Sequence, residues 1–409
     1  GYIMSYNIEN FFSKNLPGSV SIYSGFPKYN FVGGHNSEES IPISELAKSA
    51  EKVIKADGKN LALYGHNSGP QGNLLLREFL VSYLGNYTGM NISVDDILLT
   101  SGSLQALDLI NKLLLNTNDT VLVEEATYGG AISRIKNLGV NHIGIKLDKD
   151  GICLDNLIST LEELKRKNIT PKFLYTIPTV QNPTATIMPE NRRKKILEIA
   201  DKYNFLIIED DCYADLTWNR ERPKSIYSFC DNEKVIYCGS FSKSLAPALR
   251  VGYIVASWKV ISKILGFKND GGSGAIEQMI LADFCVTHYK THTLSLVKEL
   301  KRKCDIMIKS LELEFGSIAE FDVPRGGIFI WITFPPSINT NKLYEVALKK
   351  GVALNPGSEW VSNPTDGLNK IRLCFANPSE QKIKEGINKL AEICFQEFGK
   401  PNIRANMKR

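Results

Sequence analysis

The chain has 409 residues, of which 43% are hydrophobic and 23% charged, and its net charge is +5. This length predicts more than one domain, and the composition is typical of a globular protein with a sizeable buried core. Because the basic residues are spread along the chain, and because no run approaches the ~20 apolar residues of a membrane span, we expect neither a nucleic acid nor a membrane as partner.

Cysteine and histidine usage gives no sign of a disulfide framework or a metal site. His288 and His292 have the spacing of a helical pair but lack the other residues of a metal motif, so no metal is expected. The eight cysteines contain no CxxC pair, and several sit in apolar runs. We expect free thiols in a reducing compartment, and hence a cytoplasmic protein.

Seven short apolar runs alternate with amphipathic segments between about residues 96 and 260. The runs are DDILLTSG, TVLVEEA, NHIGIKL, KFLYTIP, FLIIEDD, KVIYCGS and VGYIVAS. Their nearly continuous hydrophobicity is typical of strands in a sheet that is covered on both faces. Segments such as SLQALDLINKLLL have the helical period. The pattern predicts an α/β domain with a mostly parallel, seven-stranded sheet covered by helices.

The pattern changes after about residue 290. A long amphipathic helix is followed by the apolar run GGIFIWITF, a helix near residues 340–350, and the run KIRLCFA. The last helix is expected to have Asn377 as its N-cap, with Pro378 at its first position and Glu380 completing a capping box. We predict a large domain of residues 56–296 and a smaller α+β domain of residues 1–55 and 297–409.

Ligands of open α/β sheets bind at the carboxyl ends of the strands, so the residues after each strand are informative. Gly102 and Ser103 begin a helix, which suits a phosphate, although a simple N-cap gives the same pattern. Tyr128 could lie against a flat ligand or pack in the core. Asn182 precedes Pro183 in a turn, where its amide either serves the turn alone or faces a ligand.

Two further strand ends carry charged groups. Glu209, Asp210 and Asp211 follow one another, and a carboxylate pointing into the crevice requires a cation there. Lys243 follows the next strand, and partial desolvation or a nearby cation would make its amine a nucleophile and base. Nearby donors for an anion are Ser240, Ser242 and Arg250. Together these groups require a planar ligand with a phosphate, an oxygen acceptor, a basic ring nitrogen and an aldehyde, which describes pyridoxal 5′-phosphate.

Seven motifs in this order resemble a known family. They are YGHNSGPQGNLLLREFL, TSGSLQALDL, QNPTATIMPENRRKKILEIA, IIEDDCYADL, SFSKSLAPALRVG, RGGIFIW and IRLCFA. The chain from roughly residue 20 to 395 is similar to class I/II aminotransferases, which have the type I fold of pyridoxal-phosphate enzymes. The closest resemblance is to the subgroup with 2-aminoadipate and kynurenine aminotransferases and the effector domains of MocR-type regulators.

The resemblance implies roles for the central residues. Lys243 would bind the cofactor covalently and later move a proton between the substrate α-carbon and the cofactor. Asp210 would hold the pyridine nitrogen and keep it protonated, with Asp211 as a non-catalytic neighbour. Asn182 and Tyr213 would form hydrogen bonds to the phenolic oxygen of the ring.

The resemblance also implies the groups that hold the ends of the ligands. Tyr128 would stack on the ring. The phosphate would be held by Ser103, the backbone of Leu104, Ser240, Ser242, Arg250 and, from the other subunit of a homodimer, Tyr64. The substrate would be bound by Arg372, which clamps its α-carboxylate, by Asn182, and by Gly25, which lies in the segment YSGFPKYNF at the position of a mobile recognition segment.

Three positions depart from the family pattern. Ala185 stands where glycine usually follows Asn-Pro-Thr, Ala126 stands where proline is common, and Leu104 replaces a frequent glutamine. Ala185 could narrow the space beside the substrate carboxylate. The substrate, and even the reaction type, therefore stay open.

The function implied is transfer of an amino group between an α-amino acid and a 2-oxo acid such as 2-oxoglutarate. One alternative is another pyridoxal-phosphate reaction at the α-carbon, namely decarboxylation, β-elimination or oxidation, since the cofactor accepts electrons from whichever bond lies perpendicular to its ring. A second alternative is a non-catalytic ligand-sensing domain. Against sensing, no basic helix-turn-helix region precedes residue 20 of the sequence.

Overall fold

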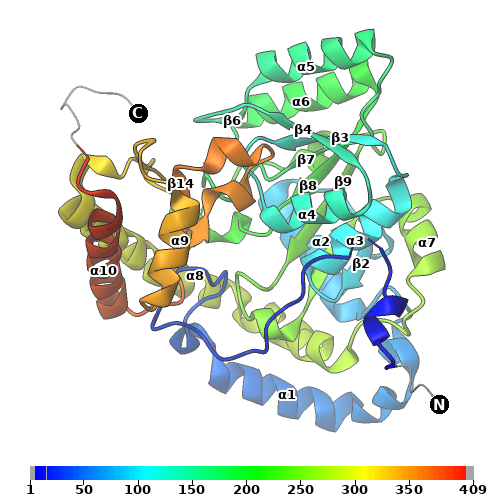
Figure 1. The fold of residues 1–409 in the computed structure, drawn as a ribbon. Coiled ribbons are helices and arrows are strands. Elements are labelled where there is room, and N and C mark those ends of the chain that lie inside the picture. The colour runs from blue at the N-terminus through cyan, green and yellow to red at the C-terminus, as the bar shows by residue number, and fades with distance from the viewer. Residues whose placement is uncertain (1–4, 15, 221, 402–409) are drawn as a thin grey trace.

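The computed structural model describes residues 5–14, 16–220 and 222–401, and its central feature is a seven-stranded sheet (Figure 1). The strand order is β2-β10-β9-β8-β7-β3-β4; β10 is antiparallel to both neighbours, and the other pairs are parallel. The strands are β2 (Ile97–Thr100), β3 (Thr120–Glu124), β4 (Asn141–Ile145), β7 (Phe173–Thr176), β8 (Leu206–Asp210), β9 (Val235–Ser240) and β10 (Gly252–Val255). The predicted α/β class and its seven strands are confirmed.

Helices cover both faces of this sheet, which explains why its strands are apolar throughout. Val121 and Val123 of β3 face one layer of helices, and Leu122 between them faces the other. The first layer is formed by α3 (Ser103–Leu114), α4 (Gly129–Asn137) and α7 (Trp258–Phe267). The second layer is formed by α2 (Leu74–Thr88), α5 (Leu154–Arg166), α6 (Glu190–Tyr203) and the first half of α8 (Ala275–Phe315).

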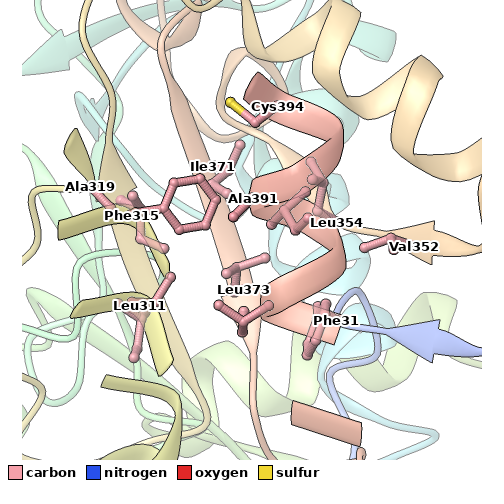
Figure 2. Close-up of a cluster of buried hydrophobic side chains, with 14 of the residues drawn as sticks. Phe31, Leu311, Phe315, Ala319, Val352, Leu354, Ile371, Leu373, Ala391 and Cys394 are labelled. Atoms are coloured by element: carbon pink, nitrogen blue, oxygen red, sulfur yellow. The ribbon is translucent and has the colours of Figure 1, made fainter. Parts of the chain in front are cut away.

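A second, smaller core lies beyond the sheet (Figure 2). It packs a three-stranded antiparallel sheet against helices and the second half of α8. Its elements are β11 (Phe329–Thr333), β13 (Asn355–Pro356), β14 (Lys370–Cys374), α9 (Thr340–Lys349) and α10 (Glu380–Phe398). The N-terminal strand β1 (Tyr29–Asn30) joins this part by pairing with β12 (Val352–Ala353). The remaining elements are α1 (Ile43–Asp57), which packs on α8, and the short hairpin of β5 (Leu147–Asp148) and β6 (Gly151–Ile152).

The division into two domains stays a prediction, because the proposed boundary at residue 296 falls inside the unbroken helix α8. One prediction in this region was wrong. The last helix begins at Glu380, and its N-cap is Ser379, whose hydroxyl accepts the backbone N–H of Lys382 at 3.2 Å. The expected N-cap Asn377 instead uses its side chain for a hydrogen bond to His35 in the N-terminal segment. Serine and asparagine cap equally well, so tertiary contacts decide between them.

The structure adds three observations on composition. All eight cysteines are free. Within residues 5–14, 16–220 and 222–401 no three His, Cys, Asp or Glu side chains gather in a way that could hold a metal ion. Among the same residues, no helix combines the length and apolar character needed to cross a membrane.

The smaller core supplies a test of the packing. Phe315, labelled in Figure 2, lies at the end of α8 and is 2% exposed. Its ring centroid is 5.4 Å from that of Phe334 and 5.7 Å from that of Phe395. Phe315→Ala should lower the free energy of unfolding by about 3–5 kcal/mol, measured by urea denaturation, because it leaves a cavity. Leu313→Ala on the same helix, at a side chain that is 81% exposed, should change it by no more than about 0.5 kcal/mol. Equal losses of unfolding free energy in the two variants would contradict the buried position of Phe315.

Candidate active site

The carboxyl ends of the parallel strands bring most of the predicted residues to one edge of the sheet. The neighbouring strands β8 and β9 end at Asp210 and Ser240, so the turn with Lys243 follows directly beside Asp210. Strand β10 runs in the opposite direction, and its first residue Gly252 pairs with both Ser240 and Thr100. The turns before β10, after β9 and after β2 therefore meet at this edge.

Asp210 is a buried carboxylate with one oxygen committed and one free. It is 5% exposed, and its Oδ2 accepts the hydroxyl of Tyr175 at 2.5 Å. Burial raises its pKa, while hydrogen bonds from Cys212 and Tyr175 act in the opposite direction. Its Oδ1 is buried without a hydrogen-bond partner. Because such an atom costs free energy, a ligand N–H placed against Oδ1 would be stabilised.

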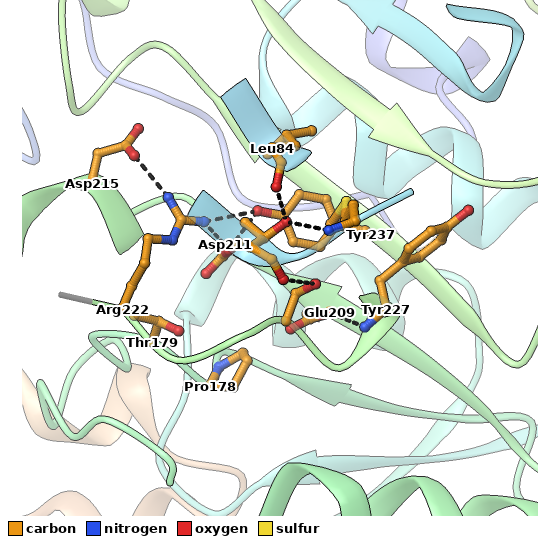
Figure 3. A network of polar contacts seen from close by, with 12 residues as sticks. Leu84, Pro178, Thr179, Glu209, Asp211, Asp215, Arg222, Tyr227 and Tyr237 are labelled. Atoms are coloured by element: carbon orange, nitrogen blue, oxygen red, sulfur yellow. Dashed lines mark hydrogen bonds and ion pairs between the residues drawn. The ribbon is translucent and has the colours of Figure 1, made fainter. Parts of the chain in front are cut away.

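The neighbouring acidic residues have other partners (Figure 3). Asp211 Oδ2 accepts Arg222 Nη2 at 2.7 Å and also the hydroxyl of Tyr237. Arg222 Nη1 continues to Asp215 at 2.8 Å. Glu209 accepts two backbone N–H groups at 2.9 Å, and burial raises its pKa to about 7. Asp211 Oδ1 is also buried without a hydrogen-bond partner, but the Arg222 ion pair neutralises the charge of Asp211. This ion pair favours Asp210 as the ligand-binding carboxylate.

The Lys243 amine lies in a half-buried position next to the N-terminal segment. Its Nζ donates to the carbonyl oxygen of Gly34 and lies 6.0 Å from the ring centroid of Tyr213. Burial, followed by the charge of Arg372, lowers the pKa of Lys243. The backbone carbonyl of Lys243 accepts the side-chain amide of Asn36 at 2.8 Å, which holds the turn in place. A lysine in such surroundings is neutral, and therefore nucleophilic, at lower pH than a free one.

A chain of hydrogen bonds joins Tyr213, Asn182 and Arg372. Asn182 Nδ2 donates to the Tyr213 hydroxyl at 3.2 Å, and Arg372 Nη1 donates to Asn182 Oδ1 at 2.8 Å. Arg372 Nε and Nη2 both donate to Asn355 Oδ1, at 3.2 and 3.1 Å. These bonds use three of the five guanidinium N–H groups and leave one on each terminal nitrogen, which matches the two oxygens of a carboxylate.

The predicted anion site lies where the turns after β2 and before β10 touch. Gly102 has a φ of 86°, and a Cβ atom there would lie 2.1 Å from Arg250 Nη2, so this position requires glycine. Helix α3 begins at Ser103 and continues with Leu104, so their backbone N–H groups belong to the first turn. Ser240 and Ser242 are buried, and the Ser240 hydroxyl accepts the Ser242 N–H at 2.9 Å. A phosphate fits this turn.

Three predicted residues lie outside this cluster or at its rim. Tyr128 is half-buried, and its ring is tilted by 53° against that of Trp360 at 5.7 Å. Tyr64 is 93% exposed and lies beside Gly271. Gly25 is exposed, and no atom lies within 4 Å of the position of a Cβ there. The described chain alone does not bring Tyr64 and Gly25 to Lys243.

The sequence reasoning missed Gly34, Asn36 and Trp360. A Cβ atom on Gly34 would lie 2.8 Å from Lys243 Nζ, so the glycine pair in NFVGGHN was the available signal. The side chains of Asn36 and Trp360 gave none, because their contacts depend on segments far apart in the sequence.

Comparisons with known proteins place the chain in a family. The family model of aminotransferase class I and II matches residues 30–390. Aromatic-amino-acid aminotransferase 1 of Thermococcus litoralis is 35% identical over 91% of this chain and 89% of its own length. The uncharacterized HTH-type transcriptional regulator YdfD of Bacillus subtilis is 34% identical over 87% of this chain and 72% of its own. The crystal structure of kynurenine aminotransferase from Pyrococcus horikoshii with PMP superposes with a TM-score of 0.87, at 34% identity, over 95% of this chain and 98% of that one.

The lowered pKa of Lys243 can be tested in the ligand-free protein by competitive acetylation. Labelling of Lys243, followed by peptide mass spectrometry, should reach its midpoint below the ordinary pKa of 10.5, because burial and the charge of Arg372 disfavour the ammonium form. In Arg372→Met the midpoint should move upward, since one of the two main causes is removed. A wild-type midpoint at or above 10.5 would contradict the buried position of the amine.

Proposed function

The chain belongs to the class I and II aminotransferases, which are pyridoxal-phosphate-dependent transferases, and from this we propose that the residues around Lys243 form its active site. The observation that carries the proposal is the placement of a half-buried lysine of lowered pKa beside the turn of a buried aspartate with a free oxygen. We propose that the amino group passes from an α-amino acid to a 2-oxo acid such as 2-oxoglutarate.

The residues present fit pyridoxal phosphate. The unpartnered Oδ1 of Asp210 suits a protonated pyridine nitrogen. The Gly102 turn, with Ser103 and Arg250, suits the phosphate, because glycine lets the backbone and the guanidinium approach each other. Tyr128 at the rim supplies an aromatic ring for stacking. Each part of the cofactor therefore has a group of matching chemistry.

The cofactor, when bound, accepts electrons from the bond that breaks at the substrate α-carbon. Lys243 would hold the cofactor covalently through its side-chain amine. Once the amino group of the substrate displaces this amine, Lys243 would accept the proton from the substrate α-carbon and donate it to the cofactor. Its lowered pKa makes the neutral, proton-accepting amine available. Asp210 would keep the ring nitrogen protonated through its charge.

Tyr213 and Asn182 would orient the cofactor ring by hydrogen bonds to its phenolic oxygen. The Tyr213 hydroxyl accepts a hydrogen bond from Asn182, so its own proton remains free for a ligand oxygen. Burial raises the pKa of Tyr213 well above its ordinary value, so the hydroxyl keeps this proton near neutral pH. The two free N–H groups of Arg372 would bind the α-carboxylate of the substrate.

The substrate class is proposed from the relatives. One relative is named for aromatic amino acids and another for kynurenine, so aromatic amino acids are the first donors to test. Other reactions at the α-carbon and a sensing role are less favoured, because the enzymes among these relatives are named as aminotransferases. The similar regulator supports the sensing alternative, yet the set of Lys243, Asp210 and Arg372 here is one that catalysis uses.

We propose a cytoplasmic homodimer in which Tyr64 reaches the phosphate of the other subunit. The exposure of Tyr64 supports this, since its ring has little contact with its own chain. The N-terminal segment also exposes large apolar side chains, which a second copy would cover. They are Val20, Ile22, Tyr23 and Phe26. The free cysteines support a reducing compartment.

The function is tested by the half-reaction of the holoenzyme. Phenylalanine should convert the bound cofactor to its amino form, seen by its absorbance, and 2-oxoglutarate should reverse the change. Lys243→Ala should abolish both the wild-type absorbance and turnover, because no amine is left to bind the cofactor or move the proton. Release of carbon dioxide or ammonia without reversal by 2-oxoglutarate would support the alternative reactions instead.

The two aspartates should differ when replaced. Asp210→Asn should lower the rate of the half-reaction by about 100-fold or more, because a preorganised charge against the ring nitrogen is lost. Asp211→Asn should instead lower the urea midpoint with a much smaller effect on the rate, since Asp211 binds Arg222 and Tyr237. A near-normal rate in Asp210→Asn would contradict the assignment of Asp210 to the ring nitrogen of the cofactor.

A further inference from the structure

Trp360 lies close to both groups to which the proposed function assigns the substrate carboxylate and the cofactor ring. It ends the short helix η10 (Gly357–Trp360) and is 8% exposed. The Cζ atom of Arg372 lies 3.8 Å from the ring centroid of Trp360. The Tyr128 ring centroid lies 5.7 Å from that of Trp360, and the two rings are tilted by 53°. The indole therefore contacts both groups at once.

The contact with Trp360 completes a cage around the Arg372 guanidinium. Asn355 holds one edge through Nε and Nη2, and Asn182 holds Nη1. The ring centroid of Phe329 lies 5.1 Å from Cζ, farther than that of Trp360. A stacked ring restrains the plane of a guanidinium without using any of its N–H groups. The two free N–H groups thus keep fixed directions and stay available for a carboxylate.

The position of Trp360 is itself fixed by the loop that carries Tyr128. The carbonyl oxygen of Trp360 accepts the backbone N–H of Thr127 at 3.0 Å. Val361 forms a β-bridge with Ala126. A Cβ atom on Gly129 would lie 2.5 Å from the carbonyl oxygen of residue 359, so the two backbones touch. The loop that follows strand β3 therefore helps to fix the position of the indole, together with the segment that contains Trp360.

We propose that Trp360 is a positioning residue that fixes the plane of the Arg372 guanidinium for binding the substrate carboxylate and couples it to the Tyr128 ring. This inference rests on the proposed function, because that function assigns the carboxylate to Arg372. The indole has no group that titrates near neutral pH, so its effect falls on binding and orientation. Its loss should raise KM for an amino acid more than it lowers kcat.

The test compares Trp360→Leu, which removes the aromatic face, with Trp360→Phe, which keeps one. Binding of 3-phenylpropionate to each holoenzyme is measured by calorimetry, with 3-phenylpropanol as the matched ligand without a carboxylate. Trp360→Leu should weaken 3-phenylpropionate about tenfold, the size of a desolvated cation–π contact. Binding of 3-phenylpropanol should change less than twofold, and Trp360→Phe should restore most of the loss. In turnover, KM for phenylalanine should rise about as much, with kcat within threefold.

Controls separate positioning from packing. The rings that lie over the Arg372 guanidinium in the described part of the chain are those of Phe329 and Trp360. Trp331 is the direct cross-strand neighbour of Arg372, and Trp331→Leu removes a nearby ring that does not stack on the guanidinium, so it should weaken 3-phenylpropionate much less than Trp360→Leu does. Should Trp360→Leu fail to fold, Trp360→Met serves the same comparison. Equal losses for both ligands, or equal losses in the leucine and phenylalanine variants, would overturn the proposal. Failure of the wild-type half-reaction would overturn the proposed function instead, because the calorimetric comparison does not require turnover.

Discussion

A buried carboxylate with one unsatisfied oxygen is the constraint on which the proposed active site depends. Tyr175 and Cys212 supply hydrogen bonds to Asp210, but its Oδ1 has no partner, and burial disfavours its charge. A charge held in this way is costly unless a cation or donor is bound. A protonated ring nitrogen placed against Oδ1, as the proposed function has it, would remove that cost. Cofactor binding there would then stabilise this edge of the sheet.

The acidic residues around Asp210 show how the chain holds this charge in place. Arg222 joins Asp211 to Asp215, and Asp215 Oδ2 accepts the Tyr289 hydroxyl at 2.6 Å. The same hydroxyl lies 2.7 Å from the hydroxyl of Ser244, the residue after Lys243. Because a tyrosine hydroxyl has one proton, it donates to the carboxylate and accepts from the serine. One network thus connects the turn after β8 with the turn that contains Lys243. Neither the Asp210 carboxylate nor the Lys243 amine takes part in this network.

The fold and the central site were predictable because both follow from local patterns. Seven apolar runs specify buried strands, and parallel strands must bring Asp210, Asn182 and Lys243 to one edge. Contacts made by distant segments were not predictable. Gly34 meets Lys243 only because β1 pairs with β12. Ala185, at the position where the family usually has glycine, adopts the left-handed region that favours glycine, with a φ of 61°.

The arginine that we propose binds the substrate carboxylate is held by both parts of the molecule. Arg372 and Asn355 lie on the three-stranded sheet, whereas Asn182 follows strand β7 of the central sheet. Trp360 belongs to the smaller part but accepts a backbone hydrogen bond from the loop after β3. The directions of the free N–H groups are therefore correct only when the two parts stand in this relative position. If Arg372 binds the substrate carboxylate as proposed, binding would favour that position in return, because binding and arrangement are thermodynamically linked. In the proposed function, substrate recognition and the packing of the two cores are therefore coupled.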